Sequence, residues 1–130
     1  MIQSTEDLEG YLARLERRFE RAEDGTYLLG MGADKPLVAL RLAGPVLVAQ
    51  VAIGEAPAGD TAAPLLRRLL ELNATALMHA AYGIERGTIV LSAALELKSL
   101  DLNELEAVLA DLDMALANQV PALRELGSKK

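Results

Sequence analysis

The sequence holds one histidine, no cysteine and many carboxylates, so those residue types decide what chemistry the chain can do. Without cysteine there is no disulfide, no thiolate nucleophile and no cysteine-ligated metal, and a single histidine argues against histidine-rich metal sites. His79 has no second histidine and no fixed carboxylate beside it in the sequence. It therefore lacks a relay partner for acid-base catalysis, and we expect His79 to be a structural residue in or near a strand.

Two further patterns resemble catalytic or nucleotide-binding motifs without completing them. Ser92 lacks the flanking glycines of a nucleophile elbow, so we expect its hydroxyl to lie on a sheet face. Gly30-Met31-Gly32 begins like a dinucleotide-binding loop, but no third glycine and no helix follow it. Neither pattern supports an enzyme.

Four carboxylates lie close together in the last third of the chain, namely Glu104, Glu106, Asp111 and Asp113. They fall within a predicted helix, where residues two apart point in different directions, so these pairs do not converge on a cation. We expect a solvated helix face and no metal site. With no catalytic set and no cofactor motif, the sequence predicts a protein that is not an enzyme.

Two groups of arginines are the candidate partner-binding residues. The first group ends the first predicted helix, where glutamates are interspersed, and could contact an acidic peptide. The second group lies on a leucine-rich helix and could anchor a partner at the rim of an interface. For both groups the alternative is an ordinary solvated surface. The candidates are Arg14, Arg17, Arg18, Arg67 and Arg68.

Composition and length limit the remaining classes. A chain of 130 residues fits a single domain, 1–130, in which we expect 126–130 to be a frayed tail. The formal charge of −6 repels nucleic-acid phosphates and anionic membranes. No uncharged stretch reaches the ~20 residues that span a bilayer. The start of the chain has no basic and apolar signal pattern, so we predict a cytoplasmic protein.

Hydrophobic periodicity and turn residues predict the elements of the first half. Ser4 and Thr5, followed by acidic residues, begin a helix over about 5–17. Asp24-Gly25 and Gly44-Pro45 predict hairpin turns. The expected strands are 27–31, 37–42 and 46–53, with an optional short strand at 19–22.

The second half predicts a helix, a hairpin and a longer helix. Asp60 or Thr61 would cap the second helix, which Asn73 would end. Strands 79–85 and 88–97 would flank a tight turn at Arg86-Gly87. Asp101 with Glu104 forms a capping box for a third helix, which Pro121 would kink or end.

The resulting order is α-β-β-β-α-β-β-α, an α+β fold with a single twisted, mainly antiparallel sheet of about five strands and helices packed on it. The apolar faces of the first and third helices should be buried against the sheet. These faces are formed by Leu8, Leu12, Leu15, Leu105, Leu109 and Leu112.

This arrangement resembles a known superfamily. The element order, residues 65–73 (LLRRLLELN), 82–91 (YGIERGTIVL) and 100–105 (LDLNEL) look like the YbjN and type III secretion chaperone-like (CesT-type) superfamily. The resemblance implies an acidic, cytoplasmic, non-enzymatic protein that forms homodimers. It also implies a surface that binds extended segments of client proteins.

Two function hypotheses follow. The first is a dimeric module that binds a peptide or protein, with a client added to an apolar edge strand. Leucines of the second helix spread wider than one stripe, so we expect a homodimer interface at Leu66, Leu69 and Leu70. The alternative is a small-molecule-binding domain or a minor enzyme with a pocket around His79 and Tyr82.

Overall fold

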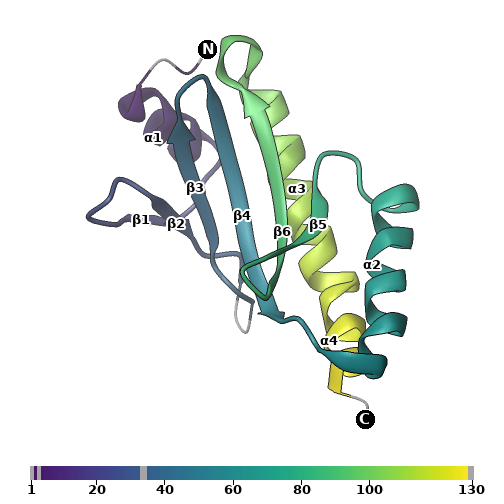
Figure 1. Ribbon diagram of the computed structural model, residues 1–130. Helices are drawn as coiled ribbons and strands as arrows, with labels where there is room; N and C mark the ends of the chain where they lie inside the picture. Colours follow the sequence, from purple (N-terminus) through teal and green to yellow (C-terminus); the bar gives the residue numbers. More distant parts are fainter. Residues whose placement is uncertain (1, 3, 33–34, 129–130) are drawn as a thin grey trace.

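One antiparallel sheet forms the centre of the protein. In the computed structural model, which describes residues 2, 4–32 and 35–128, six strands pair in the order β1-β2-β3-β4-β6-β5 (Figure 1). Each neighbouring pair is antiparallel. The strands are β1 (Phe19–Arg21), β2 (Tyr27–Leu29), β3 (Val38–Ala43), β4 (Val46–Glu55), β5 (Ala81–Glu85) and β6 (Thr88–Glu96).

Two tight turns set the register of the longest strands. Arg86 and Gly87 have φ angles of 50° and 79°, the left-handed pair that a two-residue hairpin needs, and they join β5 to β6. Gly44, with φ of 59°, joins β3 to β4 together with Pro45. The predicted hairpins at both places are confirmed.

Four helices accompany the sheet: α1 (Thr5–Arg14), α2 (Ala63–Thr75), α3 (Leu102–Asn118) and α4 (Val120–Ser128). The Ser4 hydroxyl caps α1 by accepting from the Asp7 N–H. The Asp101 carboxylate caps α3 by accepting from the Glu104 N–H at 2.7 Å, as predicted. The predicted cap of α2 is wrong, because Asp60 and Thr61 belong to a 3-10 turn (Gly59–Ala62) and the N-cap is Ala62.

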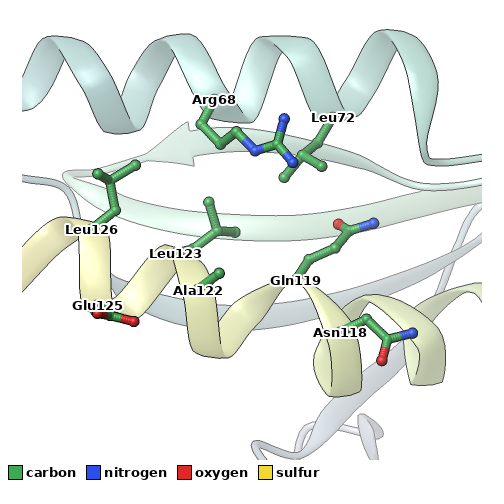
Figure 2. Close-up of a pocket in the computed structure, with 8 residues that line it drawn as sticks. All are labelled: Arg68, Leu72, Asn118, Gln119, Ala122, Leu123, Glu125 and Leu126. Atoms are coloured by element: carbon green, nitrogen blue, oxygen red, sulfur yellow. The ribbon is translucent and has the colours of Figure 1, made fainter.

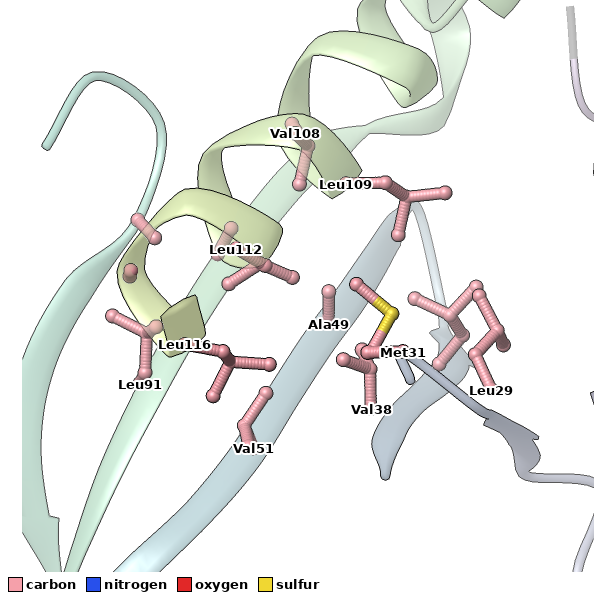
Figure 3. Close-up of a cluster of buried hydrophobic side chains, with 14 of the residues drawn as sticks. Leu29, Met31, Val38, Ala49, Val51, Leu91, Val108, Leu109, Leu112 and Leu116 are labelled. Atoms are coloured by element: carbon pink, nitrogen blue, oxygen red, sulfur yellow. The ribbon is translucent and has the colours of Figure 1, made fainter. Parts of the chain in front are cut away.

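The core lies between one face of the sheet and helices α1 and α3. Alternate residues of β4, Leu47, Ala49 and Val51, are buried. Figure 3 shows Ala49 and Val51 facing the apolar side chains of α3. Of the six leucines expected here, Leu15 is only partly buried and the others are fully buried: Leu8, Leu12, Leu105, Leu109 and Leu112. The predicted fold class is therefore confirmed.

The opposite face of the sheet carries no helix (Figure 1). Its side chains are small or polar at the centre, and Val90 is nevertheless buried there. Gln50 in β4 donates a hydrogen bond to Glu85 in β5 at 2.9 Å. Val90 lies on β6, the strand between them, so this bond passes over the valine.

The two ends of the chain differ most from expectation. The first helix stops at Arg14, and the optional strand is present as β1. The third helix breaks at Gln119, two residues before Pro121, and α4 follows. Proline fits the first turn of a helix, so Pro121 lies in a new helix rather than only ending the old one. The expected frayed tail is helical through Ser128, and 129–130 lie outside the described residues.

None of the described helices is both long and apolar enough to cross a membrane.

Candidate functional site

The two edges of the sheet differ in how their outward backbone groups are used. In the β5–β6 hairpin, Glu85 and Thr88 flank the two-residue turn and form a hydrogen-bonded pair. Hydrogen-bonded and non-bonded pairs alternate along antiparallel strands, so the N–H and C=O of Tyr82 and Ile84 point away from β6. The side chain of Asn73 in α2 bonds both groups of Tyr82. Its Oδ1 accepts from the Tyr82 N–H at 2.7 Å, and its Nδ2 donates to the Tyr82 C=O at 3.1 Å. Asn73 thus takes the place that a neighbouring strand would occupy.

A buried carboxylate holds the start of β5. Asp111 in α3 is only 4% exposed, and its Oδ2 accepts from the backbone N–H groups of His79 and Ala80 at 3.0 and 3.1 Å. The hydroxyl of Tyr82 donates to Gln119, between α3 and α4, at 2.6 Å. Burial, and then the nearby charge of Asp111, raise the pKa of Tyr82 to about 12. Three side chains from the helical layer therefore fix β5.

The β1 edge has no such cover. The Arg18 C=O accepts from the Gly30 N–H at 3.4 Å, and the Ala22 N–H donates to the Thr26 C=O at 2.8 Å. These bonds set the alternation, so the N–H and C=O of Phe19 and Arg21 point away from β2. Within the described residues these outward groups have no hydrogen-bond partner.

A depression of about 310 Å³ lies beside this edge. It contains the apolar side chains of Leu28 and Leu37, of which Leu37 is 52% exposed. Two charged residues, an aromatic residue and a glycine complete it, namely Arg18, Glu20, Phe19 and Gly30. An extended chain laid along β1 would therefore meet apolar surface and the exposed cationic side chain of Arg18.

The core-facing side of β1 is rigid. Phe19 packs edge-on against Tyr27 with ring centroids 5.4 Å apart, and the Arg21 guanidinium lies 5.8 Å from the centre of the same ring. Tyr27 is fully buried, and its hydroxyl donates to Glu9 at 2.7 Å. Its burial and this bond raise the pKa of Tyr27. The short strand is thus held in place although it forms the edge.

A second exposed surface joins α2 to β5. Leu70 is 70% exposed and Ile84 is 52% exposed, and both line a hollow of about 290 Å³. Leu66, Leu69, Asn73, Tyr82 and Gly83 line the rest of it. This hollow is mainly apolar and lies beside β5, next to the place where Asn73 bonds Tyr82.

The model of the CesT_Tir_1 family matches residues 1–129. The chain belongs to the CesT_Tir_1 family. No curated protein matches the sequence.

Solved structures of similar fold agree with this family. A chain of the heterodimeric ExoU-SpcU complex from the type III secretion system of Pseudomonas aeruginosa has a TM-score of 0.72 at 21% identity, covering 91% of this chain and 98% of that one. YbjN from E. coli has a TM-score of 0.71 at 14% identity, covering 96% and 94%. A chain of the ExsC-ExsE complex has a TM-score of 0.64 at 16% identity and full coverage of both. The resemblance to type III secretion chaperones and YbjN is confirmed.

The structure separates the arginines that the sequence grouped. Arg17 pairs with Asp113 at 2.8 Å, so it is engaged within the CesT_Tir_1 fold. Arg14 and Arg18 are exposed, and Arg18 lines the depression beside β1. On α2, Arg67 is exposed while Arg68 lines a hollow between α2 and α4 (Figure 2).

The three leucines proposed for a dimer interface have different surroundings. Leu69 is only 5% exposed and belongs to the core, Leu66 is partly buried, and Leu70 is exposed. A helix periodicity alone does not say which side of a wide apolar face is turned to the core. Leu70 is thus the residue most available to a partner.

The residues offered for a small-molecule pocket do not converge. The His79 side chain is exposed and only its backbone N–H bonds Asp111, whereas Tyr82 is buried with its hydroxyl bonded to Gln119. No group of three potential metal ligands occurs among the described residues.

The expected solvated face is wrong at Asp111, which is buried, whereas Glu104 and Glu106 are exposed and Asp113 is partly exposed. Asp111 lies three residues after Val108 and four before Ala115, on the buried stripe of α3. A carboxylate on an apolar stripe was the available signal for its role, and the sequence interpretation missed it.

The two aspartates of α3 give a matched test. Asp111→Ala should lower the free energy of unfolding by roughly 3 kcal/mol, because it leaves two backbone N–H groups without their charged acceptor. Asp113→Ala should lower it by about 0–1 kcal/mol, since its ion pair with Arg17 is partly exposed. Urea unfolding of both variants measures the difference. Equal losses would contradict the assigned role of Asp111.

The raised pKa of Tyr82 predicts a loss of stability in alkali. The folded value of about 12 lies above the ordinary value of 10.0, so the folded state keeps the proton to higher pH. This stabilisation is complete below the ordinary value and is lost as the pH rises towards the folded value. The free energy of unfolding should therefore fall more steeply between about pH 10 and pH 12 in the wild type than in Tyr82→Phe. Parallel slopes would remove Tyr82 as the cause.

Proposed function

We propose that this protein is a non-enzymatic binding module that holds an extended segment of a partner protein as an added strand at β1. The observation that carries the proposal is the pair of unpaired backbone positions, Phe19 and Arg21, on the one sheet edge that no helix covers. Strand addition uses such groups for affinity and pockets beside them for selectivity. The β5 edge is less suited, because Asn73 already bonds Tyr82 there.

The depression beside β1 suggests which segments would fit. Successive side chains of an added strand point to opposite faces, so every second one would face Leu28 and Leu37. Arg18 favours an acidic residue at the same face, whereas Glu20 restricts where that residue can lie. Solved complexes of similar fold, among them ExoU-SpcU and the HopA1-SchA chaperone-effector complex, support a protein partner.

We further propose that the protein forms a homodimer through α2 and β5. The exposed side chains of Leu70 and Ile84 form an apolar surface with Leu66. Arg67 is exposed and lies three residues before Leu70 on α2, so we expect it at the rim of this surface. A two-fold axis beside α2 would cover this surface with its copy. The β1 edges would then remain free for partner segments. The cytoplasmic location stays a prediction.

Proline at β1 tests the first proposal. Arg21→Pro removes the outward N–H of Arg21, and edge strands tolerate proline where that N–H faces solvent. A partner protein isolated from the native host with the wild-type chain should lose at least about tenfold in affinity for Arg21→Pro, since a donor in the ladder is lost. Isothermal titration of the purified pair measures it.

Arg21→Ala is the matched control, because it removes the guanidinium and keeps the N–H. It should bind within about twofold of the wild type, as a rim charge alone contributes little. Hydrogen exchange on the complex should also protect the Phe19 and Arg21 amides. Loss of affinity in both variants, or protection confined to other strands, would contradict strand addition at β1.

A charge at Leu70 tests the dimer. Light scattering should show a dimer for the wild type and a 13.9 kDa monomer for Leu70→Asp, because the carboxylate would be buried in an apolar interface. Met114→Asp, at another exposed apolar position on α3, should remain dimeric. A monomeric wild type would reject self-association, and a dimeric Leu70→Asp would reject this interface.

A further inference from the structure

The last helix, α4, is held by few contacts. It spans nine residues after the break at Gln119, and its buried side chains are Val120 and Leu123, with Leu126 partly buried. Ordering nine residues costs conformational entropy, which a small number of apolar contacts must offset. Segments of this kind open locally without global unfolding.

Hollows lie on both sides of α4. One, of about 270 Å³, separates it from α2, and Figure 2 shows Leu123 and Leu126 pointing towards α2 across this space. The other, of about 260 Å³, lies between α4 and the ends of β4 and β6. Among the described residues α4 buries two side chains, Val120 and Leu123, whereas α3 buries seven. α4 therefore has less buried contact with the rest of the fold than α3 has.

The surface beneath α4 is an apolar groove. Leu65, Leu69 and Leu72 of α2 form one wall, and Ile53 of β4 and Ile89 of β6 form the other. All five are buried with α4 in place. Arg68 lines the same groove and has no ion-pair partner within the described residues.

We propose that α4 is a displaceable helix and that the groove beneath it binds an amphipathic helix of a partner protein in its place. The occupant repeats the apolar spacing of Leu123 and Leu126, three residues apart, and adds an acidic residue that pairs with Arg68. α4 competes with this partner from within the same chain, so the groove is available only while α4 is open. This surface lies apart from the β1 edge.

A covalent lock on α4 tests the proposal in the full-length chain. The absence of cysteine makes Glu55→Cys/Arg124→Cys a clean pair, since both residues are exposed and line the same hollow. A labelled peptide of residues 118–128 is the probe. It should bind the free double variant and lose at least about tenfold in affinity once a short bis-maleimide joins α4 to β4.

Leu123→Ala in the unlocked chain should tighten peptide binding by more than about tenfold, because it weakens the internal competitor.

Two further probes complete the test. A peptide with Leu123→Asp should not bind, and one with Ala122→Glu should bind more tightly to the wild type but not to Arg68→Ala. Hydrogen exchange should show faster exchange in α4 than in α3. Equal peptide affinity for locked and unlocked chains, no binding even to Leu123→Ala, or exchange of α4 only with the whole core would overturn the proposal.

Discussion

Every sheet leaves backbone N–H and C=O groups at its two edges, and the rest of this structure depends on how those groups are satisfied. At β5, helix α2 lies alongside the strand and Asn73 supplies one donor and one acceptor to Tyr82. Asp111 extends the same arrangement to Ala80. At β1 the outward groups face solvent, although Phe19 packs edge-on against Tyr27 and holds the strand. The two edges therefore differ: helix side chains satisfy the outward groups of Tyr82 and the N–H of Ala80 at β5, whereas the outward groups of Phe19 and Arg21 at β1 stay open.

Local signals predicted much of the fold. The Asp101 cap and the Arg86-Gly87 turn depend on neighbours within a few residues, so the sequence predicted both. The contacts at β5 join residues 9 and 31 positions apart, and periodicity carries no information on such distances. The sequence therefore indicated only a helix end at Asn73 and not its bonds to Tyr82. The open edge at β1 could not be predicted either, because it depends on which strands lie at the centre.

Similarity to solved structures at 14–21% identity shows how few residues specify this backbone. Sequences that differ this widely can share one backbone as long as apolar volume and patterning are kept in the core. Residues at the surface are not bound by that condition. Leu28, Leu37 and Arg18 line a surface depression beside β1 and can therefore be replaced without loss of volume from the core.

The positions of two tyrosines make the molecule its own optical probe. The chain has no tryptophan, so tyrosine dominates its near-ultraviolet absorption and emission. Tyr27 lies beside the open edge with its hydroxyl on a carboxylate, and Tyr82 lies in the closed edge with its hydroxyl on an amide. Because Tyr11 is the third tyrosine, double tyrosine-to-phenylalanine variants that keep only Tyr27 or only Tyr82 would report each end of the sheet separately, without any attached dye.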